Sequence, residues 1–344
     1  MEEKNLLIKA FLFLFLISGF IACSKQNVPI EKSLSGSTMG TTYHIKLIAG
    51  NVQNYEKLHQ QIDSVLQRVN LQMSTYIDSS EISRFNSFND TAWFKISKDF
   101  YTVLKEGLRI SKLTGGAYDI TVGPLVNLWG FGPEMHEYQV PDDKQIEERK
   151  KIIGYKNLRI KENPFAVKKL IPEIYVDLSS IAKGFGVDKV SEFLDENKIK
   201  NYMVEIGGEV RTKGRKGNND FWRIGIQYPD GSNRIAKIVK LYNLSMATSG
   251  DYYNFFELNG KKYSHTIDPR TGKPVTHNLV SVSVIEPNCM VADGLATALL
   301  VLGPVEGFTF ALKEKLPVIM FVKEKGEFVE KFTPDFKSLI EKNN

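Results

Sequence analysis

Hydrophobic and polar residues alternate along several short segments, which predicts β-strands. The segment "TTYHIKLIA", which starts at Thr41, shows this alternation, and "SVSVI" is a shorter apolar segment typical of a buried strand. Ile174, Tyr175, Val176 and Leu178 predict the end of another strand. The other strands are predicted over residues 221–231 (a strand and a turn), 237–250 and 316–322.

A second set of segments repeats its hydrophobic residues every three or four positions, which is the period of an amphipathic helix. One such helix follows Ser97, a good N-cap residue, and ends at Gly115-Gly116. A charged helix ends at Gly154, and an apolar helix ends at Gly303. The first predicted helix contains Tyr55, Leu58, Ile62, Val65, Leu66, Val69 and Met73. Helices and strands alternate without a strict βαβ order, so the sequence predicts an α+β fold.

The N-terminal segment is not expected to belong to the fold. Residues 10–22 form an apolar run that spans about 20 Å as a helix, too short to cross a bilayer comfortably. The run ends at Ala22-Cys23-Ser24 and looks like a bacterial lipoprotein signal in which Cys23 is lipidated. An ordinary signal peptide or a membrane anchor is the alternative. We expect a signal peptide over 1–22, a lipid-anchored tether over 23–35 and one folded domain over 36–335. The protein would then face the periplasm from the membrane.

Composition and charge exclude other classes of protein. The chain has 344 residues, of which 42% are hydrophobic and 25% charged, as in ordinary globular proteins. The net charge of +5 is not concentrated on any segment, which argues against a nucleic-acid-binding protein. Only two cysteines are present, so lipidation of Cys23 would leave Cys289 without an intramolecular disulfide partner.

The segment "VDLSSIAKGFGVDKV" places polar groups at a predicted strand-to-helix turn. A helix that begins near Ser179-Ser180 would offer free N–H groups to an anion, and Lys183 would add a positive charge. Asp177 could accept hydrogen bonds from the hydroxyl or ring N–H groups of the same ligand. A phosphate-bearing ligand is one interpretation, and a capped structural helix with a surface lysine is the other.

Two further segments contain candidate metal-binding or catalytic residues. Asp293 and Thr297 lie four residues apart on one face of an apolar helix, so their oxygens could hold a hard cation such as Mg²⁺. Asp293 could instead cap the helix or pair with a lysine. His265, in "YSHTIDPRTGKP", is a candidate general base, although a single histidine is more often structural.

Eight motifs together resemble the family of FAD:protein FMN transferases, the ApbE family, in their order along residues 35–315. The motifs are "GSTMGTTY", "STYIDSSEISRFN", "GAYDITVGPLVNLWGFG", "VDLSSIAKGFGVD", "VEIGGEVRTKG", "ATSGDYYNFF", "YSHTIDPRTGKP" and "ADGLATALLVLG". The resemblance implies an enzyme with an FAD cleft between two intertwined subdomains. It also implies that FAD and Mg²⁺ are used to attach FMN through its phosphate to a threonine of a partner protein, with release of AMP. Partners in this family are subunits of membrane electron-transport complexes, such as sodium-translocating NADH:quinone reductase and Rnf-type complexes.

The same resemblance implies a role for individual residues. His265 would deprotonate the acceptor threonine, and Lys183 and Asp293 would also take part in catalysis. The residues implied to line FAD are Met39, Tyr76, Ala117, Tyr118, Asp119, Asp177, Lys183 and Ile267. The residues implied to hold Mg²⁺ are Ser180, Asp293, Ala296 and Thr297. Ser180 could bind through its carbonyl oxygen, and Ala296 would bind through a backbone oxygen.

Two rival functions use the same residues differently. A periplasmic FAD pyrophosphatase would release FMN and AMP without any protein acceptor. A flavin-binding lipoprotein without catalytic activity would keep FAD intact when Mg²⁺ is added. The presence of Asp293, Thr297 and His265 argues against simple storage, which needs neither a metal nor a base.

Overall fold

The computed structural model describes residues 30–49, 54–133, 140–232, 234–251 and 254–340. The predicted signal segment 1–22 and the lipidation site at Cys23 lie outside the described residues. The predicted tether over 23–35 needs one correction. Residues 30–35 form the first part of strand β1 (Ile30–Thr38), because they pair with residues 44–49 of β2.

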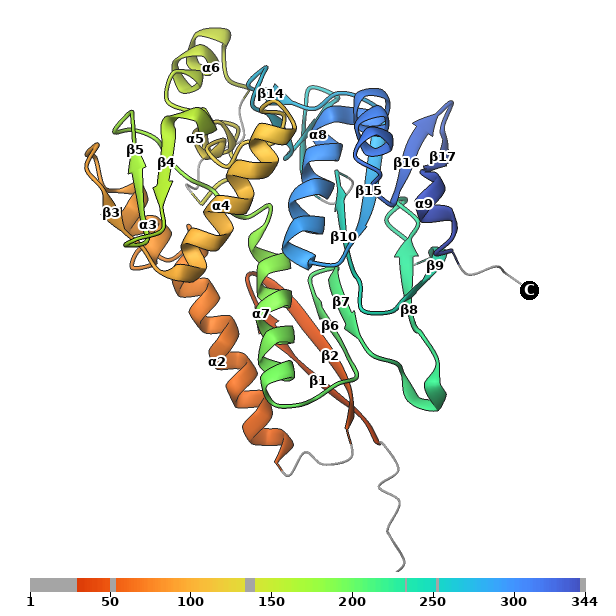
Figure 1. The fold of residues 1–344 in the computed structure, drawn as a ribbon. Coiled ribbons are helices and arrows are strands. Elements are labelled where there is room, and N and C mark those ends of the chain that lie inside the picture. Colours follow the sequence, from red (N-terminus) through yellow and green to blue (C-terminus); the bar gives the residue numbers. More distant parts are fainter. Residues whose placement is uncertain (1–29, 50–53, 134–139, 233, 252–253, 341–344) are drawn as a thin grey trace, which may run out of the picture.

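The described residues form one large antiparallel sheet of eight strands, in the order β1-β2-β6-β7-β10-β15-β16-β17 (Figure 1). The predicted strands 41–49 and 316–322 correspond to β2 and β16, and "SVSVI" lies within β15. The bounds after β1 are β2 (Thr41–Ala49), β6 (Tyr202–Ile206), β7 (Glu209–Lys213), β10 (Ser245–Gly250), β15 (Leu279–Glu286), β16 (Val318–Glu324) and β17 (Glu327–Phe332).

Three helices cover one face of this sheet (Figure 1). Helix α7 (Ala182–Glu196) packs against β6 and β7, and α8 (Cys289–Lys313) packs against β10 and β15. Helix α2 (Tyr55–Met73) lies beside α7 and begins as the sequence predicts. The opposite face is covered by β8 (Trp222–Gln227), β9 (Ile235–Leu241) and the short helix α9 (Pro334–Lys337).

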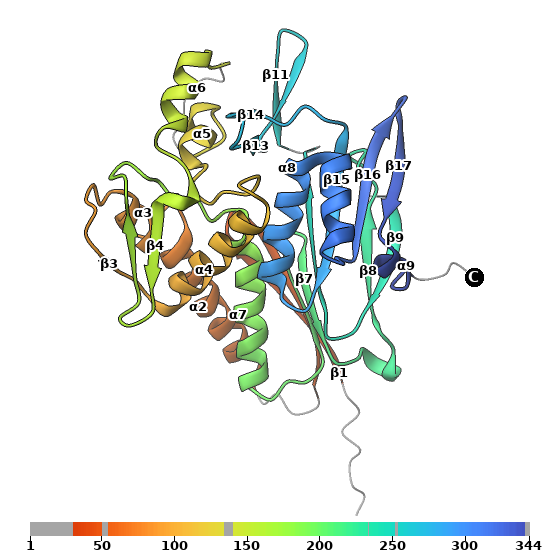
Figure 2. The same cartoon turned by 45° about the horizontal axis from the view of Figure 1, so that its top comes forward.

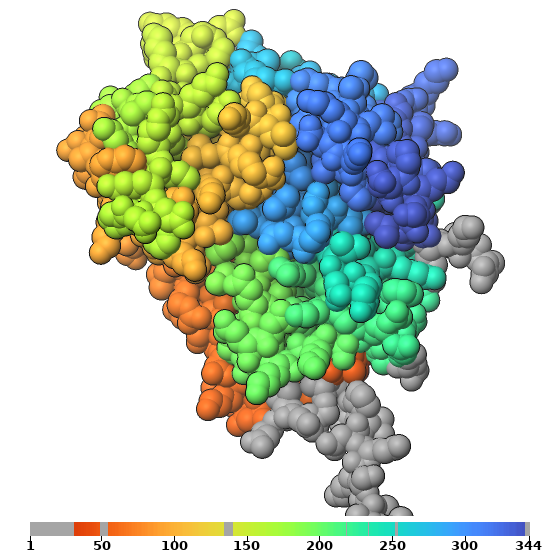
Figure 3. Space-filling view, viewed as in Figure 1, coloured from red at the N-terminus to blue at the C-terminus, as the bar shows by residue number. Residues whose placement is uncertain are grey.

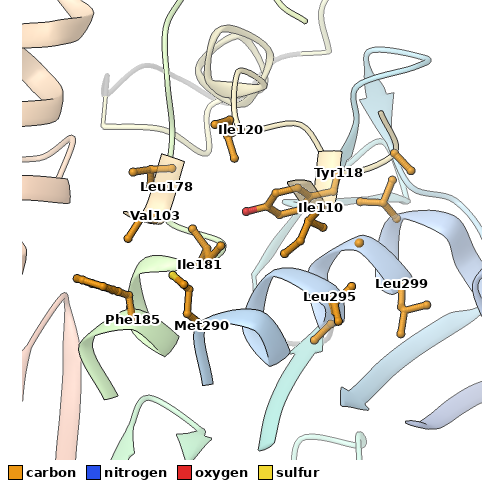
Figure 4. Close-up of a cluster of buried hydrophobic side chains, with 14 of the residues drawn as sticks. Val103, Ile110, Tyr118, Ile120, Leu178, Ile181, Phe185, Met290, Leu295 and Leu299 are labelled. Carbon is orange, nitrogen blue, oxygen red and sulfur yellow. The ribbon is translucent and has the colours of Figure 1, made fainter. Parts of the chain in front are cut away.

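A second group of elements packs against α2 and α8 through helix α4 (Lys98–Leu113). Side chains from α4, α7 and α8 meet in one buried cluster, with Ile110, Ile181 and Leu295 near its centre (Figure 4). The group also contains α3 (Glu81–Asn86), β3 (Phe94–Lys95), α5 (Gly123–Leu128), α6 (Asp143–Lys150), η2 (Tyr155–Asn157), β4 (Leu158–Lys161) and β5 (Ala166–Lys169). In the space-filling view the surfaces of α4 and α8 lie against each other (Figure 3).

Smaller elements lie above the end of the large sheet (Figure 2). Strands β11 (Phe255–Leu258) and β12 (Lys261–Ser264) form a projecting hairpin, followed by the short pair β13 (Ile267–Asp268) and β14 (Lys273–Pro274). A single helical turn, η3 (Gly217–Asn219), precedes β8.

Three sequence predictions need correction. The segment 174–178 belongs to no strand, although Ile174, Val176 and Leu178 are buried. Residues 237–250 form parts of two strands in different sheets, β9 and β10, because the backbone bends at residues 242–243, where Asn243 has φ 53°. The charged helix α6 ends at Lys150 rather than Gly154. The prediction that the apolar helix ends at Gly303 is confirmed, because Gly303 has non-helical backbone angles (φ 77°, ψ −175°) and a second helical segment follows it within α8.

Helix α8 is long and apolar enough to cross a membrane by composition. Burial within the protein also explains why α8 is apolar. It packs between α7, α4 and strands β10 and β15, and most of its residues up to Gly303 are buried. A helix that is apolar on all sides is expected at the centre of a protein.

Candidate active site

A cavity of about 1020 Å³ lies where the second group of elements meets the end of the large sheet. It lies beside a step in that sheet, by which we mean the place where β10 extends beyond its pairing with β7. Strand β10 pairs with β15 along its whole length but with β7 only at Ser245 and Met246. The next part of β10, including Thr248, Ser249 and Gly250, therefore lines the cavity instead of pairing with β7.

The structure gathers almost all predicted site residues around this cavity. The predicted residues that line it are Met39, Tyr76, Ala117, Tyr118, Asp119, Asp177, Ser180, Lys183, His265, Ile267, Asp293 and Thr297. Ala296 is the exception among the predictions, since it is fully buried in α8 and does not line the cavity. Segments that are widely separated in the sequence thus meet at one place.

The start of α7 differs from the prediction. The helix begins at Ala182, its N-cap residue is Ile181, and neither Ser179 nor Ser180 caps it. In the first turn of the helix as it is observed, the backbone N–H of Gly184 donates to Asp293 Oδ2 at 2.9 Å. The first turn of α7 is therefore partly neutralised by a carboxylate of α8.

Gly184 also allows this close contact between the two helices. A Cβ at this position would clash with the carbonyl oxygen of Cys289 and lie 2.8 Å from Asp293 Cβ. Gly184 thus serves the packing of α7 against α8. At Gly186 a Cβ would lie 2.8 Å from Met39 Cε, which is part of the cavity wall.

The inner end of the cavity contains an acidic residue that the sequence analysis missed. Glu209 is 1% exposed, and its Oε2 lies 2.7 Å from Lys183 Nζ in an ion pair. No donor is aligned on this oxygen for a hydrogen bond. Glu209 follows Gly207 and Gly208, both at positive φ, in the motif "VEIGGEVRTKG". The pair Gly207-Gly208, which is typical of a tight turn, was the sequence signal that could have pointed to Glu209.

Burial shifts the pKa values of this charged group. It raises the pKa of Glu209, and the carboxylate of Asp293 raises it further although Lys183 opposes both. Burial likewise raises the pKa of Asp293 against the effect of Lys183 and the Gly184 N–H. For Lys183 burial opposes the charged form, but Glu209 and Asp293 outweigh it and the pKa is raised. Two buried carboxyl groups therefore share one ammonium group.

Hydroxyl groups lie next to this cluster. Thr297 Oγ1 is one turn from Asp293 on α8 and lies 3.2 Å from Ser249 Oγ. Ser180 Oγ donates to the hydroxyl of Tyr118 at 3.0 Å. Among the described residues there is no group of three or more His, Cys, Asp or Glu side chains suited to a metal ion. A cation bound here would need oxygen ligands from hydroxyls, water or substrate.

The outer part of the cavity carries polar and aromatic groups. Tyr76 is 71% exposed in the loop after α2. Although most of the side chain is exposed, partial desolvation of its hydroxyl and the nearby carboxylate of Asp177 raise the pKa of Tyr76. Asp177 Oδ1 accepts from the backbone N–H of Ser179 at 2.8 Å. A flat ring could be held here between the exposed phenol and this carboxylate.

Asp119 lines the cavity but has a structural role in the described fold. Its Oδ1 accepts from the backbone N–H and hydroxyl of Thr121, and its Oδ2 accepts from the N–H of Tyr155. Both oxygens are therefore used within the chain. Met39 has φ 50° in the two-residue turn between β1 and β2, a conformation that such hairpins require.

His265 lies at the base of the β11–β12 hairpin. Its Nδ1 lies 2.9 Å from the carbonyl oxygen of Asn254, which can only accept, so Nδ1 carries the proton. Nε2 is then the basic nitrogen of the neutral ring. Burial lowers the pKa of His265, although the Asn254 carbonyl and Asp251 oppose this effect. The ring is therefore suited to accept a proton at neutral pH.

Comparisons with known proteins agree with this arrangement. The model of the ApbE family matches residues 39–320. A Vibrio cholerae protein named FAD:protein FMN transferase is 46% identical, over 96% of this chain and 97% of the relative. A Haemophilus influenzae protein of the same name is 45% identical over 95% and 98%.

A solved structure agrees as well. The structure titled "Flavin Transferase ApbE from Vibrio cholerae" superposes with a TM-score of 0.84 at 46% identity. The superposition covers 90% of this chain and 99% of the other. The α+β fold expected from the sequence is therefore confirmed, and the chain belongs to the ApbE family.

Proposed function

We propose that this protein is an FAD:protein FMN transferase. The observation that carries the proposal is the cavity itself, in which the Lys183–Glu209–Asp293 cluster and the neutral His265 occur together. Curated relatives with this name match nearly the whole chain, which supports the same activity. The inner acidic cluster and the outer Tyr76–Asp177 region would accommodate the two ends of one elongated nucleotide.

In the proposed reaction a threonine hydroxyl of the acceptor protein attacks the phosphorus of the FMN half of FAD. The new O–P bond forms as the pyrophosphate P–O bond breaks, and AMP leaves with the electron pair. His265 Nε2 takes the hydroxyl proton, a contribution of about 10²–10⁴-fold in such reactions. Lys183 offsets negative charge that develops on the phosphate oxygens.

The residues of the cavity fit a requirement for Mg²⁺. Two buried carboxyl groups, Glu209 and Asp293, face one ammonium group, so the charges here do not favour a pyrophosphate by themselves. Asp293 and Thr297 would hold the ion with Ser180 nearby, and water and phosphate oxygens would complete its shell. The bound ion would neutralise phosphate charge and polarise the P–O bond. Ala296 could contribute only a backbone oxygen from inside α8.

We further propose that Cys23 is lipidated and anchors the enzyme to the membrane, facing the periplasm. This agrees with an acceptor that is a subunit of a membrane electron-transport complex of the sodium-translocating NADH:quinone reductase or Rnf type. The folded part begins at β1, only seven residues after Cys23, so it would remain close to the bilayer.

Mass spectrometry tests the proposed function. Residues 24–344 are incubated with FAD, Mg²⁺ and the soluble domain of such an acceptor subunit. We expect the acceptor to gain the mass of one FMN minus water, with one AMP released per modified acceptor. AMP release at the same rate without the acceptor would instead establish an FAD pyrophosphatase. Intact FAD with each acceptor tried would contradict both enzymes and favour a flavin-binding protein.

A further inference from the structure

The side chain of Asn86 pairs with the backbone of Val176 in the way a neighbouring strand would. Asn86 Oδ1 accepts from the Val176 N–H at 2.8 Å, and Asn86 Nδ2 donates to the Val176 carbonyl at 2.9 Å. The next residue, Asp177, donates its backbone N–H to the Ile120 carbonyl at 2.8 Å. The segment before Asp177 is thus fixed on both sides although it belongs to no sheet.

Lys169 also stabilises the contact between the end of α3 and the segment before Asp177. It is fully buried at the end of β5, and its Nζ donates to the carbonyls of Asn86 at 3.0 Å and Pro172 at 3.2 Å. The ammonium also lies 4.9 Å from the centre of the Phe85 ring. A buried ammonium group needs such partners, because leaving it unpaired is costly. Lys169 therefore ties the end of α3 to the start of the segment that leads to Asp177.

Helix α3 connects the contact between Asn86 and Val176 to the loop that carries Tyr76. The loop before α3 carries Tyr76, and Ser80 caps the helix through a bond from the Ser83 N–H at 3.0 Å. Glu81 is fixed at the first turn by the hydroxyl of Ser97 at 2.6 Å. A short, doubly anchored helix thus links Tyr76 to Asn86.

We infer that Asn86 is a positioning residue for flavin binding, which holds Asp177 at a fixed place relative to Tyr76. Neither Asn86 nor Lys169 lines the cavity, so both act only through the residues that they support. The identity of the ligand rests on the proposed function. The motif "STYIDSSEISRFN" then contains both Tyr76 of the cavity wall and Asn86, which fixes the segment that carries Asp177.

Binding of FAD to the Asn86→Ala variant tests the inference. FAD is titrated in the presence of EDTA, and binding is followed by its fluorescence. We expect the Kd of FAD to rise about tenfold, because two hydrogen bonds that fix Val176 are lost. In turnover with Mg²⁺ the KM for FAD should rise while kcat stays within about twofold. The milder Asn86→Asp variant keeps the acceptor for the Val176 N–H and should show an intermediate Kd.

Asn201→Ala is the matched control. Asn201 Oδ1 also accepts a backbone N–H at 2.8 Å, from Arg215, but Asn201 does not line the cavity. The substitution should lower thermal stability without changing the Kd of FAD. Hydrogen exchange gives a second readout, and the amides of Val176 and Asp177 should exchange faster in Asn86→Ala than in the wild type.

The outcomes separate two kinds of failure. If the wild type binds FAD and Asn86→Ala binds it equally tightly, the inference is wrong and the proposed function stands. Unchanged exchange at Val176 and Asp177 also overturns the inference, whatever the ligand. If the wild type binds no FAD either with EDTA or with Mg²⁺, the proposed function fails, and the exchange experiment alone decides whether Asn86 fixes the segment.

Discussion

At the scale of single residues, the site depends on buried charges, which interact strongly with one another. Asp293 is 3% exposed, and it accepts the Gly184 N–H while lying near Lys183. A charge in such a place interacts with its neighbours far more strongly than on the surface. Substitutions at Asp293 and at His265, which carries the basic nitrogen, should therefore have the largest effects on the rate.

Asp293→Asn should lower the transfer rate by at least about 100-fold, since a buried charge on the proposed metal site is removed. The amide oxygen can still accept the Gly184 N–H, so the melting temperature should change little. Rates of acceptor labelling and thermal unfolding measure the two effects. Asp188 on α7 is another buried carboxylate, and it accepts from the N–H groups of Cys289 and Met290 at the start of α8. Asp188→Asn should reduce stability but keep metal-dependent turnover, and the reverse pattern would contradict the assignment.

The dependence of kcat/KM on pH tests His265. The neutral ring is the base, so the rate rises with pH through the pKa of His265 and is complete above it. Burial lowers this pKa. The acid limb should therefore have its midpoint below the ordinary histidine value of about 6.5, with full activity at neutral pH. His265→Ala should lower the rate by about 10²–10⁴-fold and remove that limb. An unchanged acid limb in the variant would exclude His265 as the base.

At the scale of elements, the close approach of α7 and α8 sets the geometry of the charged cluster. Helix periodicity and caps predict most of the individual elements, including α2 and the start of α4 after Ser97. Local patterns do not predict the segment 174–178, because the side chain of Asn86, 90 residues away, replaces a partner strand. Ser179 and Ser180 are good capping residues by type, yet contacts with Asp293 and Tyr118 determine this turn. Tertiary contacts therefore override local preference at the site itself.

Gly184→Ala tests the role of the helix contact. The added methyl group would clash with the Cys289 carbonyl and with Asp293 Cβ, so the helices must move apart. We expect a loss of about 1–3 kcal/mol in the free energy of unfolding, as in other overpacked cores. Urea unfolding measures it, and transfer activity should fall as Lys183 shifts from Asp293. Gly217 has open space around its Cα and an ordinary φ, so Gly217→Ala should be nearly neutral. Equal effects of the two substitutions would contradict a special role for Gly184.

At the scale of the whole molecule, the sequence predicts the α+β class, and all of the predicted site residues except Ala296 line the cavity. The order of strands and the step between β7 and β10 could not be predicted, because they depend on pairing between segments far apart in the chain. Glu209 was missed for the same reason, since only the folded chain brings it to Lys183. Asp119 was placed at the flavin from its motif, whereas the structure uses both of its oxygens to hold a loop. Motif order identifies which residues meet, and the fold determines what each one contacts.

The most direct test of the central claim is flavin fluorescence in a denaturing gel. Residues 24–344 are incubated with FAD and the soluble acceptor domain in lanes with Mg²⁺, with EDTA, and with the His265→Ala variant. We expect a fluorescent band at the size of the acceptor with Mg²⁺, no band with EDTA, and a band weakened by about 10²-fold or more for the variant. A band of equal intensity in all three lanes would contradict the roles of the metal and of His265. No acceptor band in any lane, with FAD consumed to FMN and AMP, would contradict transfer itself.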